Sequence, residues 1–217
     1  MIRVLVVDDD PMVRRLLRTI LRPDDIEVVA EASDGDEVVA VVQAHHPDVV
    51  LMDLRMERVD GIRATASVRA LPSPPGVIAM TSFDTEAAIL DAVHAGAGGF
   101  LAKDAGPDEI VAAVRAVAAG EGWLSARAAR TVMARVAVDP GAGARREAAA
   151  ALAGLTEREL EVARAVAEGL SNAEIAQRVY ASEATVKTHL SRAMDKLGVG
   201  NRVQLAVVVD RAAIEAR

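Results

Sequence analysis

The chain of 217 residues contains no cysteine and few aromatic residues: two phenylalanines, one tryptophan and one tyrosine. Without cysteine, the protein cannot form a disulfide framework, a thiolate metal site or a thiol nucleophile, and it is compatible with a reducing compartment. Proteins that bind single-stranded nucleic acid stack the bases on aromatic side chains. The scarcity of these side chains therefore argues against that function.

Long hydrophobic runs are missing as well. The apolar run near the N-terminus covers residues 2–7, which is too short for a signal peptide, and no segment approaches the length of a membrane span. We therefore expect a soluble, cytoplasmic protein with no membrane partner. The sequence also has neither G-x-x-x-x-G-K-[ST] nor G-x-G-x-x-G, so it gives no support for nucleotide binding.

The formal net charge of −7 comes entirely from the N-terminal part. Residues 1–150 carry 16 Lys and Arg against 23 Asp and Glu, whereas residues 151–217 carry nine of each sign. The C-terminal part is therefore neutral, and a local basic face can form there.

The pattern of residues 1–120 alternates short apolar runs with longer amphipathic stretches. The apolar runs are 2–7, 26–32, 48–53, 76–82 and 98–103, and the amphipathic stretches are 11–21, 34–45, 61–70, 85–95 and 107–119. Five strands alternating with five helices predict an α/β fold, a doubly wound five-stranded parallel sheet with helices on both faces.

Residues 121–150 have a different composition, and we interpret them as a linker. They contain a candidate helix over 126–136, followed by the breaker cluster "DPGAGA", from which we expect flexibility around 139–144. The Ala-rich segment after this cluster is compatible with a further helix, which the sequence does not settle.

Residues 151–217 carry only helical signals and predict a small all-α domain. Two capping boxes, "TERE" and "SNAE", open the first two helices, and Ser182 opens a third that ends at Gly198. A fourth helix is expected over 202–216. Two short helices joined by a tight turn near residues 179–181 are typical of a helix-turn-helix.

The third helix of this domain has one apolar and one polar face. Val186, Leu190, Ala193 and Leu197 recur at helical spacing and form a buried stripe. The opposite face carries Lys187, Thr188, Ser191 and Arg192. That face is either a solvated surface or a surface that contacts bases and phosphates in a DNA groove. The fourth helix, with Val203, Ala206, Val207 and Ile214 toward one side, either packs within its own domain or forms a two-fold dimer contact.

Polar side chains follow four of the predicted strands. Ligands of doubly wound sheets bind outside the carboxyl ends of the strands, which is where Asp8, Asp9, Asp53, Thr81 and Lys103 lie. Three carboxylates form a hard oxygen site suited to Mg²⁺, and a carboxylate can accept a phosphoryl group. Lys103 and Thr81 could then donate hydrogen bonds to phosphoryl oxygens. The alternatives are that each residue is only a polar strand end, or that Lys103 forms a simple salt bridge with Asp53.

Residues 1–120 resemble the receiver domain of response regulators in the order and spacing of "VVDDD", "DVVLMDLRMERVDG", "IAMTSFD" and "GAGGFLAKD". The resemblance implies that a sensor histidine kinase phosphorylates Asp53, that Asp8, Asp9 and Asp53 hold Mg²⁺, and that Thr81 and Lys103 contact the phosphoryl group. It also implies that Thr81 and Phe100 form a conformational switch, although Phe100 is equally compatible with a plain core position.

This sequence departs from many receivers at two positions. Glu57 and Asp104 stand where proline is common, the second of these being frequent in the subfamily with this type of C-terminal domain. Glu57 in place of proline affects the expected shape of the loop over residues 54–60.

Residues 155–202 closely resemble the LuxR-type helix-turn-helix, with "GLSNAEIA" and "TVKTHLSRAMDKLGV" as the most specific stretches. The resemblance places Thr185, Lys187 and Thr188 against double-stranded DNA, with Lys196 near the DNA backbone. The complete set of expected DNA-contacting residues is Asn172, Thr185, Lys187, Thr188, Ser191, Arg192 and Lys196.

The whole chain therefore resembles a NarL/FixJ-type response regulator. The resemblance implies a DNA-binding transcriptional regulator that is not an enzyme, is controlled by phosphorylation and forms a homodimer when phosphorylated. Two other classes remain open. One is a phosphatase or phosphotransferase with Asp53 as nucleophile, although the sequence lacks a D-x-D-x-T loop. The other is a regulator that acts without phosphorylation.

Overall fold

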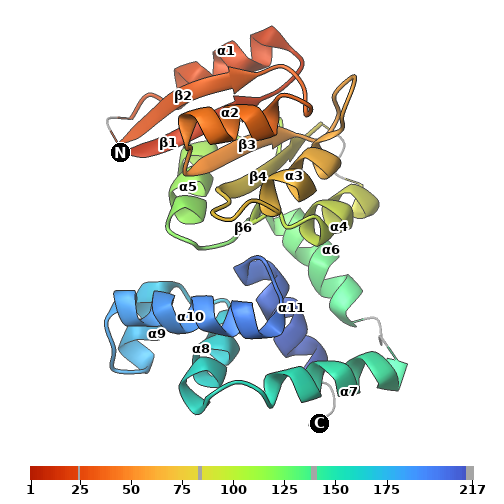
Figure 1. Ribbon diagram of the computed structural model, residues 1–217, viewed down its shortest axis with the longest axis vertical. Helices are drawn as coiled ribbons and strands as arrows, with labels where there is room; N and C mark the ends of the chain where they lie inside the picture. The colour runs from red at the N-terminus through yellow and green to blue at the C-terminus, as the bar shows by residue number, and fades with distance from the viewer. Residues whose placement is uncertain (24, 83–84, 138–140, 214–217) are drawn as a thin grey trace. The chain divides into compact units, whose positions relative to one another are not determined.

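The computed structural model describes residues 1–23, 25–82, 85–137 and 141–213 (Figure 1). The chain divides into two compact units, residues 1–131 and 132–217, and the boundary between them falls within one helix. None of the helices in the described parts of the chain is long and apolar enough to cross a membrane.

The first unit is built on a parallel sheet with strand order β2-β1-β3-β4-β5-β6. The strands are β1 (Ile2–Val7), β2 (Ile26–Ala32), β3 (Val49–Asp53), β4 (Gly76–Thr81), β5 (Gly99–Ala102) and β6 (Trp123–Leu124). The helices are α1 (Pro11–Ile20), α2 (Val38–His45), α3 (Gly61–Arg69), α4 (Glu86–His94) and α5 (Pro107–Ala118). The predicted doubly wound α/β fold is confirmed.

Most strand residues are apolar because helices cover both faces of the sheet, although β2 carries the exposed Glu27 and Glu31. Val4 and Val6 of β1 contribute to a core with α1 and α5, whereas Leu5 and Val7 contribute to a core with α2 and α3. All five residues of β3 are buried. Full burial of a Val or Leu side chain contributes about 1.5–3 kcal/mol, so the central strands stabilise the unit strongly.

The sheet has six strands rather than the predicted five. The two residues of β6 pair in parallel with β5, with Trp123 opposite Gly99 and Leu124 opposite Phe100. A strand of two residues has too short a pattern to be predicted from periodicity. Its consequence is that the first unit extends beyond the predicted limit at residue 120.

The second unit is helical, with α7 (Gly141–Leu152), α8 (Glu157–Ala167), α9 (Asn172–Arg178), α10 (Glu183–Leu197) and α11 (Arg202–Ala213). The helix α6 (Ala126–Ala137) contains the boundary between the units. Thr156 and Ser171 form the predicted capping boxes, Ser182 caps α10, and Gly198 ends α10 with a φ of 64°.

The segment over 121–150 differs from the predicted linker. Residues 139 and 140 of the expected flexible segment lie outside the described residues, but residues 141–144 belong to α7. The many alanines that follow favour a helix, and the two glycines fall in its first turn, where helix propensity has least effect. Ala148 is buried, and Leu152 packs against the core that α8 to α11 share. The second unit therefore begins before the predicted limit at residue 151.

Candidate functional site

The predicted polar side chains meet at one edge of the sheet, because the strands are parallel and their carboxyl ends coincide. Asp8 follows β1, Asp53 ends β3, Thr81 ends β4 and Lys103 follows β5. The Lys103 Nζ lies 2.6 Å from Asp8 Oδ2 and 2.9 Å from Asp53 Oδ2, so one ammonium bridges two carboxylates. The salt bridge with Asp53 that the sequence left open is present, and it includes Asp8.

Burial and charge act in opposite directions at this bridge. Asp8 is 1% exposed and Asp53 4%. Burial raises the pKa of Asp8 above its usual value, although the hydrogen bond from Lys103 opposes the change. Burial alone would lower the pKa of Lys103, but its hydrogen bonds to Asp53 and Asp8 raise that pKa above the usual value. Lys103 is therefore held in its charged form between the two acids.

The three consecutive carboxylates after β1 have different roles. Asp10 caps α1, because its Oδ1 accepts a hydrogen bond of 2.7 Å from the Met12 backbone N–H. Asp9 is exposed, and Asp8, Asp9 and Asp53 each offer one oxygen within 4.8 Å of the others. This set of hard oxygen donors fits Mg²⁺, which binds few carboxylates and keeps several waters.

The loop between β3 and α3 is fixed by a residue that sequence analysis did not select. The Asp34 carboxylate accepts hydrogen bonds from the backbone N–H groups of Arg58, at 2.9 Å, and Val59, at 2.8 Å. Burial would raise the pKa of Asp34, but these hydrogen bonds and the Arg58 charge lower it below its usual value. The exposed Glu57 replaces the common proline in a loop that Asp34 anchors instead.

Asp34 was assigned to a helix over 34–45, but α2 begins only at Val38. Asp34 and Gly35 lie in the turn before it, and a Cβ on Gly35 would lie 2.4 Å from the Val59 carbonyl oxygen. The "SDGD" cluster in the sequence was a turn signal that could have placed Asp34 outside the helix.

Thr81 and Phe100, the expected switch residues, are both buried. Phe100 lies on β5 opposite Ala79 of β4 and is among the largest fully buried side chains. In this structure Phe100 therefore occupies a core position.

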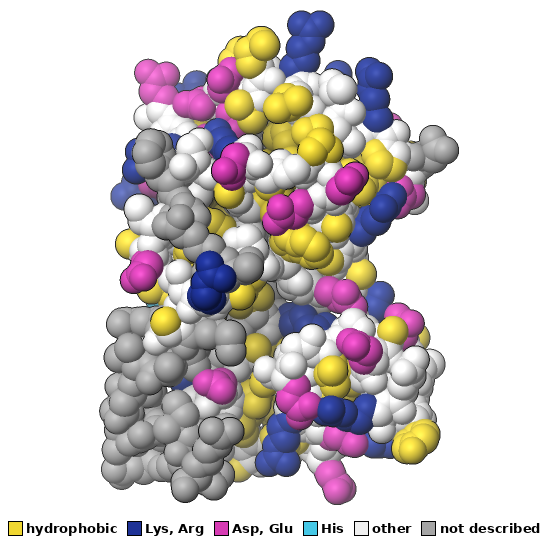
Figure 2. Space-filling view, turned by 180° about the vertical axis from the view of Figure 1, so that it is seen from behind, with side chains coloured by type: hydrophobic (Ala, Val, Ile, Leu, Met, Phe, Trp, Pro, Cys, Tyr) yellow, Lys and Arg dark blue, Asp and Glu magenta, His cyan; other side chains and the backbone are white. Residues whose placement is uncertain are grey.

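The helix-turn-helix consists of α9 and α10. Val186, Leu190 and Ala193 are buried as predicted, and Leu197 packs against the same core. The side chains expected to contact DNA along the other side of α10 are exposed; they are Thr185, Lys187, Thr188, Ser191 and Arg192. On the side shown in Figure 2, acidic and basic side chains are interspersed over the described surface.

Two residues of the predicted DNA-contacting set have internal partners. Asn172 is 1% exposed, and its Oδ1 accepts a hydrogen bond of 3.0 Å from Arg202, so its side chain is not available to DNA in this structure. Its assignment is corrected, because the first residue of α9 faces the core. Lys196 donates to Glu159 Oε2 at 2.7 Å, and this internal ion pair competes with a role at the DNA backbone.

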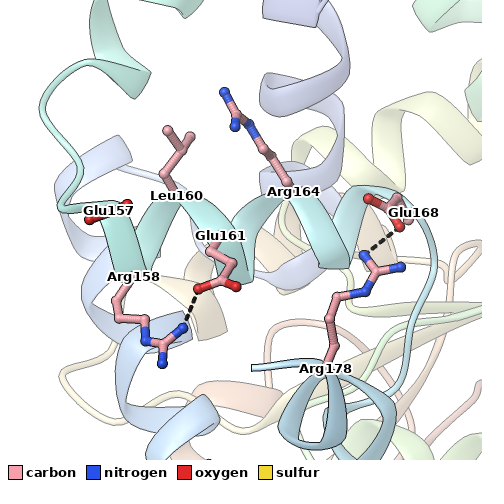
Figure 3. A pocket seen from close by; sticks show the side chains of 7 residues that line it. All are labelled: Glu157, Arg158, Leu160, Glu161, Arg164, Glu168 and Arg178. Carbon is pink, nitrogen blue, oxygen red and sulfur yellow. Dashed lines mark hydrogen bonds and ion pairs between the residues drawn. The ribbon is translucent and has the colours of Figure 1, made fainter. Parts of the chain in front are cut away.

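A cavity of about 610 Å³ lies along α8 near the end of α9 (Figure 3). Its walls carry charges of both signs from Glu157, Arg158, Glu161, Arg164, Glu168 and Arg178, with Leu160 between them. Arg158 pairs with Glu161, and Arg178 pairs with Glu168, so most of this charge is neutralised locally.

Two family profiles match this chain. The response regulator receiver domain matches residues 4–115, and the luxR family of bacterial regulatory proteins matches residues 153–209. The solved structure of the response regulator ChrA of a heme-sensing two-component system is 40% identical, with a TM-score of 0.53, and the match covers 99% of this chain and 98% of ChrA.

Similar proteins match over nearly their whole length. The transcriptional regulatory protein LiaR of Bacillus subtilis (strain 168) is 41% identical over 212 residues, 97% of this chain and 98% of LiaR. The DNA-binding transcriptional activator DevR/DosR of Mycobacterium tuberculosis (strain ATCC 25618 / H37Rv) is 37% identical over 208 residues, 95% of this chain and 93% of that protein. The chain thus belongs to the NarL/FixJ-type response regulators, two-component transcriptional regulators in which a receiver domain precedes a LuxR-type helix-turn-helix domain.

Proposed function

We propose that this regulator binds DNA under the control of phosphorylation, with Asp53 as the acceptor and a sensor histidine kinase as the donor. The observation that carries the proposal is the Lys103 ammonium bridging Asp8 and Asp53 at the edge of the sheet. A buried carboxylate beside a fixed cation can take up a phosphoryl group without leaving the added negative charge uncompensated.

Asp8, Asp9 and Asp53 would hold Mg²⁺, since this ion prefers oxygen ligands and their carboxylate oxygens lie close together. When bound, Mg²⁺ would neutralise charge on the transferring group. Lys103 supplies a second positive charge from the protein itself.

In the transfer, a carboxylate oxygen of Asp53 attacks the phosphorus of a phosphohistidine. A P–O bond forms as the P–N bond breaks, and the electron pair of the broken bond returns to the ring nitrogen. The ring leaves as neutral imidazole, because its second nitrogen carries the proton. The Lys103 ammonium and the Thr81 hydroxyl would donate hydrogen bonds to the phosphoryl oxygens of the product.

The DNA-binding part of the proposal concerns the exposed side of α10. Thr185, Lys187 and Thr188 lie near the N-terminus of this helix, the part that enters the major groove in helix-turn-helix proteins. Ser191 and Arg192 extend the same face. Two copies would bind two half-sites, and phosphorylation would favour the homodimer.

The phosphoacceptor is tested by incubation with acetyl phosphate and Mg²⁺, followed by intact mass spectrometry. Wild type and the control Asp91→Asn, an exposed acid on α4, should each gain one phosphoryl group. Asp53→Asn should gain none, and chelation of Mg²⁺ should prevent the gain in wild type. A phosphorylated Asp53→Asn protein would refute the assignment.

A further inference from the structure

Tyr180, in the turn between α9 and α10, is the most exposed of the large hydrophobic side chains in the described part of the chain. It is 97% exposed, whereas the other exposed large apolar residues, Met1, Met12 and Leu16, all lie in the first unit. It is also the chain's only tyrosine. An isolated exposed aromatic residue in a protein with so few aromatics calls for a physical explanation.

The backbone at Tyr180 has a conformation that side chains with a Cβ rarely adopt. Its φ is 51°, in the left-handed region. The Ala181 N–H donates to the Ala176 carbonyl at 3.0 Å, and the Tyr180 N–H donates to the Gln177 carbonyl at 3.4 Å. This pair of hydrogen bonds is the Schellman helix end, in which glycine usually occupies the position that Tyr180 holds here.

Two contacts with α8 and its C-cap residue hold the end of α9 in place. Val179 is buried, and its carbonyl oxygen accepts a hydrogen bond of 3.1 Å from Arg158 at the start of α8. Arg178 pairs with Glu168 at the other end of α8, at 2.5 Å (Figure 3). Two contacts therefore fix the end of α9, and the next residue, Tyr180, projects into solvent.

The position of the Tyr180 side chain next to α10 indicates which ligand it could contact. Tyr180 precedes Ser182, the N-cap of α10, by two residues. In helix-turn-helix proteins the N-terminal residues of the second helix contact base edges while the first helix crosses the DNA backbone, so a side chain in the turn that joins them can come near the phosphates. A tyrosine hydroxyl is a common donor to DNA phosphate oxygens. No described residue accepts a hydrogen bond from the Tyr180 hydroxyl, so it is available to such a ligand.

We propose that Tyr180 is a DNA-positioning residue whose hydroxyl donates a hydrogen bond to a backbone phosphate at the edge of the groove that α10 enters. The inference rests on the proposed DNA-binding function and adds a contact that does not depend on base sequence. The left-handed backbone at Tyr180 is in keeping with the tendency of backbone strain to occur at functional positions.

The structure allows stability and binding to be separated by substitution. Tyr180→Phe keeps the ring and removes only the hydroxyl. Tyr180→Gly removes the side chain and relieves the left-handed conformation, so it should raise the thermal stability of the second unit. If Tyr180 had only a structural role, at least one of these variants would be less stable than wild type. If Tyr180 contacts a phosphate, both variants should bind DNA more weakly without being less stable.

Binding is measured by fluorescence anisotropy with the full chain, treated with acetyl phosphate, on a duplex selected by wild type and on a scrambled duplex. Both variants should bind both duplexes about tenfold more weakly, as expected for a lost hydrogen bond to a charged group. The slope of affinity against salt should stay unchanged in Tyr180→Phe, because a neutral donor releases no counterion. An equal affinity of wild type and Tyr180→Phe would overturn the inference. A loss on the selected duplex alone would also overturn it, since that result indicates base recognition.

A second readout uses the single tyrosine directly. In protein labelled with fluorotyrosine, the one ¹⁹F resonance should shift on addition of the selected duplex and lose part of its sensitivity to exchange of H₂O for D₂O. An unchanged resonance in protein that anisotropy shows to be bound would contradict the contact. If wild type binds neither duplex, the proposed function itself fails. If wild type binds and the variants bind equally well, only the role of Tyr180 fails.

Discussion

At the scale of single residues, the tightest steric constraint next to Asp53, the proposed phosphoacceptor, lies at Gly61, the first residue of α3. A Cβ at this position would lie 1.9 Å from the Asp53 carbonyl oxygen, a distance that no side chain can tolerate. The Gly61 N–H also donates to the Leu54 carbonyl at 3.1 Å, so the loop closes directly onto the end of β3. Gly61 therefore permits the close approach of α3 to the end of β3, where Asp53 lies.

We expect Gly61→Ala to displace the loop or β3, to lower the free energy of unfolding by at least about 2 kcal/mol, and to slow phosphorylation of Asp53. Urea unfolding and intact mass after acetyl phosphate measure the two effects. The matched control is Gly106→Ala, because a Cβ there meets no atom within 4 Å and the backbone φ is −67°. Similar stability of the two variants would show that the close approach is not a constraint.

Glu159 connects the start of α8 to the end of α10 and makes the second unit sensitive to acid. Its Oε2 accepts hydrogen bonds from Lys196 and from the Thr156 backbone N–H, and these lower its pKa from 4.5 to about 2. Because the folded pKa is the lower one, this contribution to stability is complete above the unfolded value of 4.5 and is lost as the pH falls toward about 2.

We expect Glu159→Gln to be less stable than wild type at neutral pH and the difference to shrink as the pH falls from about 5 to about 2. Hydrogen exchange of amides in α8 and α10, measured across this pH range, reports the difference. Glu157→Gln, an exposed change on the same helix, serves as the control. A Glu159→Gln effect that stayed constant with pH would show that the charge of Glu159 is not responsible.

Single residues also show which contacts the sequence can predict and which it cannot. The convergence of Asp8, Asp53 and Lys103 could be predicted, because parallel strands bring their carboxyl ends to one edge. The burial of Asn172 and the pairing of Lys196 could not, because both depend on partners 30 and 37 residues away in the chain. Helical periodicity assigns a side chain to a face but does not identify what the opposing element presents.

At the scale of elements, prediction succeeded where the pattern was long. The five strands β1 to β5 were found because each is a mostly apolar run, as expected for strands that helices cover. The sixth strand has only two residues, and its pairing depends on the β5 backbone. The helix α7 was obscured by "DPGAGA", since glycine and proline mark breaks even where a helix starts directly after them.

The packing of α7 within the second unit can be tested at one of its buried positions, Ala148. Ala148 is 8% exposed, whereas Ala150, two residues along the same helix, is exposed. Ala148→Asp would bury a carboxylate without a partner and should destabilise the second unit by about 2 kcal/mol or more, and Ala150→Asp should have little effect. The stabilities of the two variants are compared by thermal unfolding, followed by the NMR signals of the backbone amides of α11. Equal stability of the two variants would show that the burial of Ala148 does not contribute to the stability of the second unit.

At the scale of the whole molecule, the two units carry separate parts of the function. The acidic edge of the sheet lies in residues 1–131, and the exposed face of α10 lies in residues 132–217. Phosphorylation can control DNA binding only if it shifts an equilibrium between states that differ in DNA affinity. Thr81 and Phe100 are our proposed elements of that equilibrium, since both lie on strands that end at the acidic edge. Dimerisation, which we propose above, is one way in which phosphorylation would raise the affinity for DNA.

The most direct test of this coupling is a DNA titration of the full chain by fluorescence anisotropy at one fixed salt concentration, with and without acetyl phosphate. Wild type should bind the selected duplex more tightly after phosphorylation, and its oligomeric state should change if dimerisation is the cause. Asp53→Asn should bind with the same affinity in both conditions. Wild type that bound equally well with and without a phosphoryl group on Asp53 would contradict phosphorylation control.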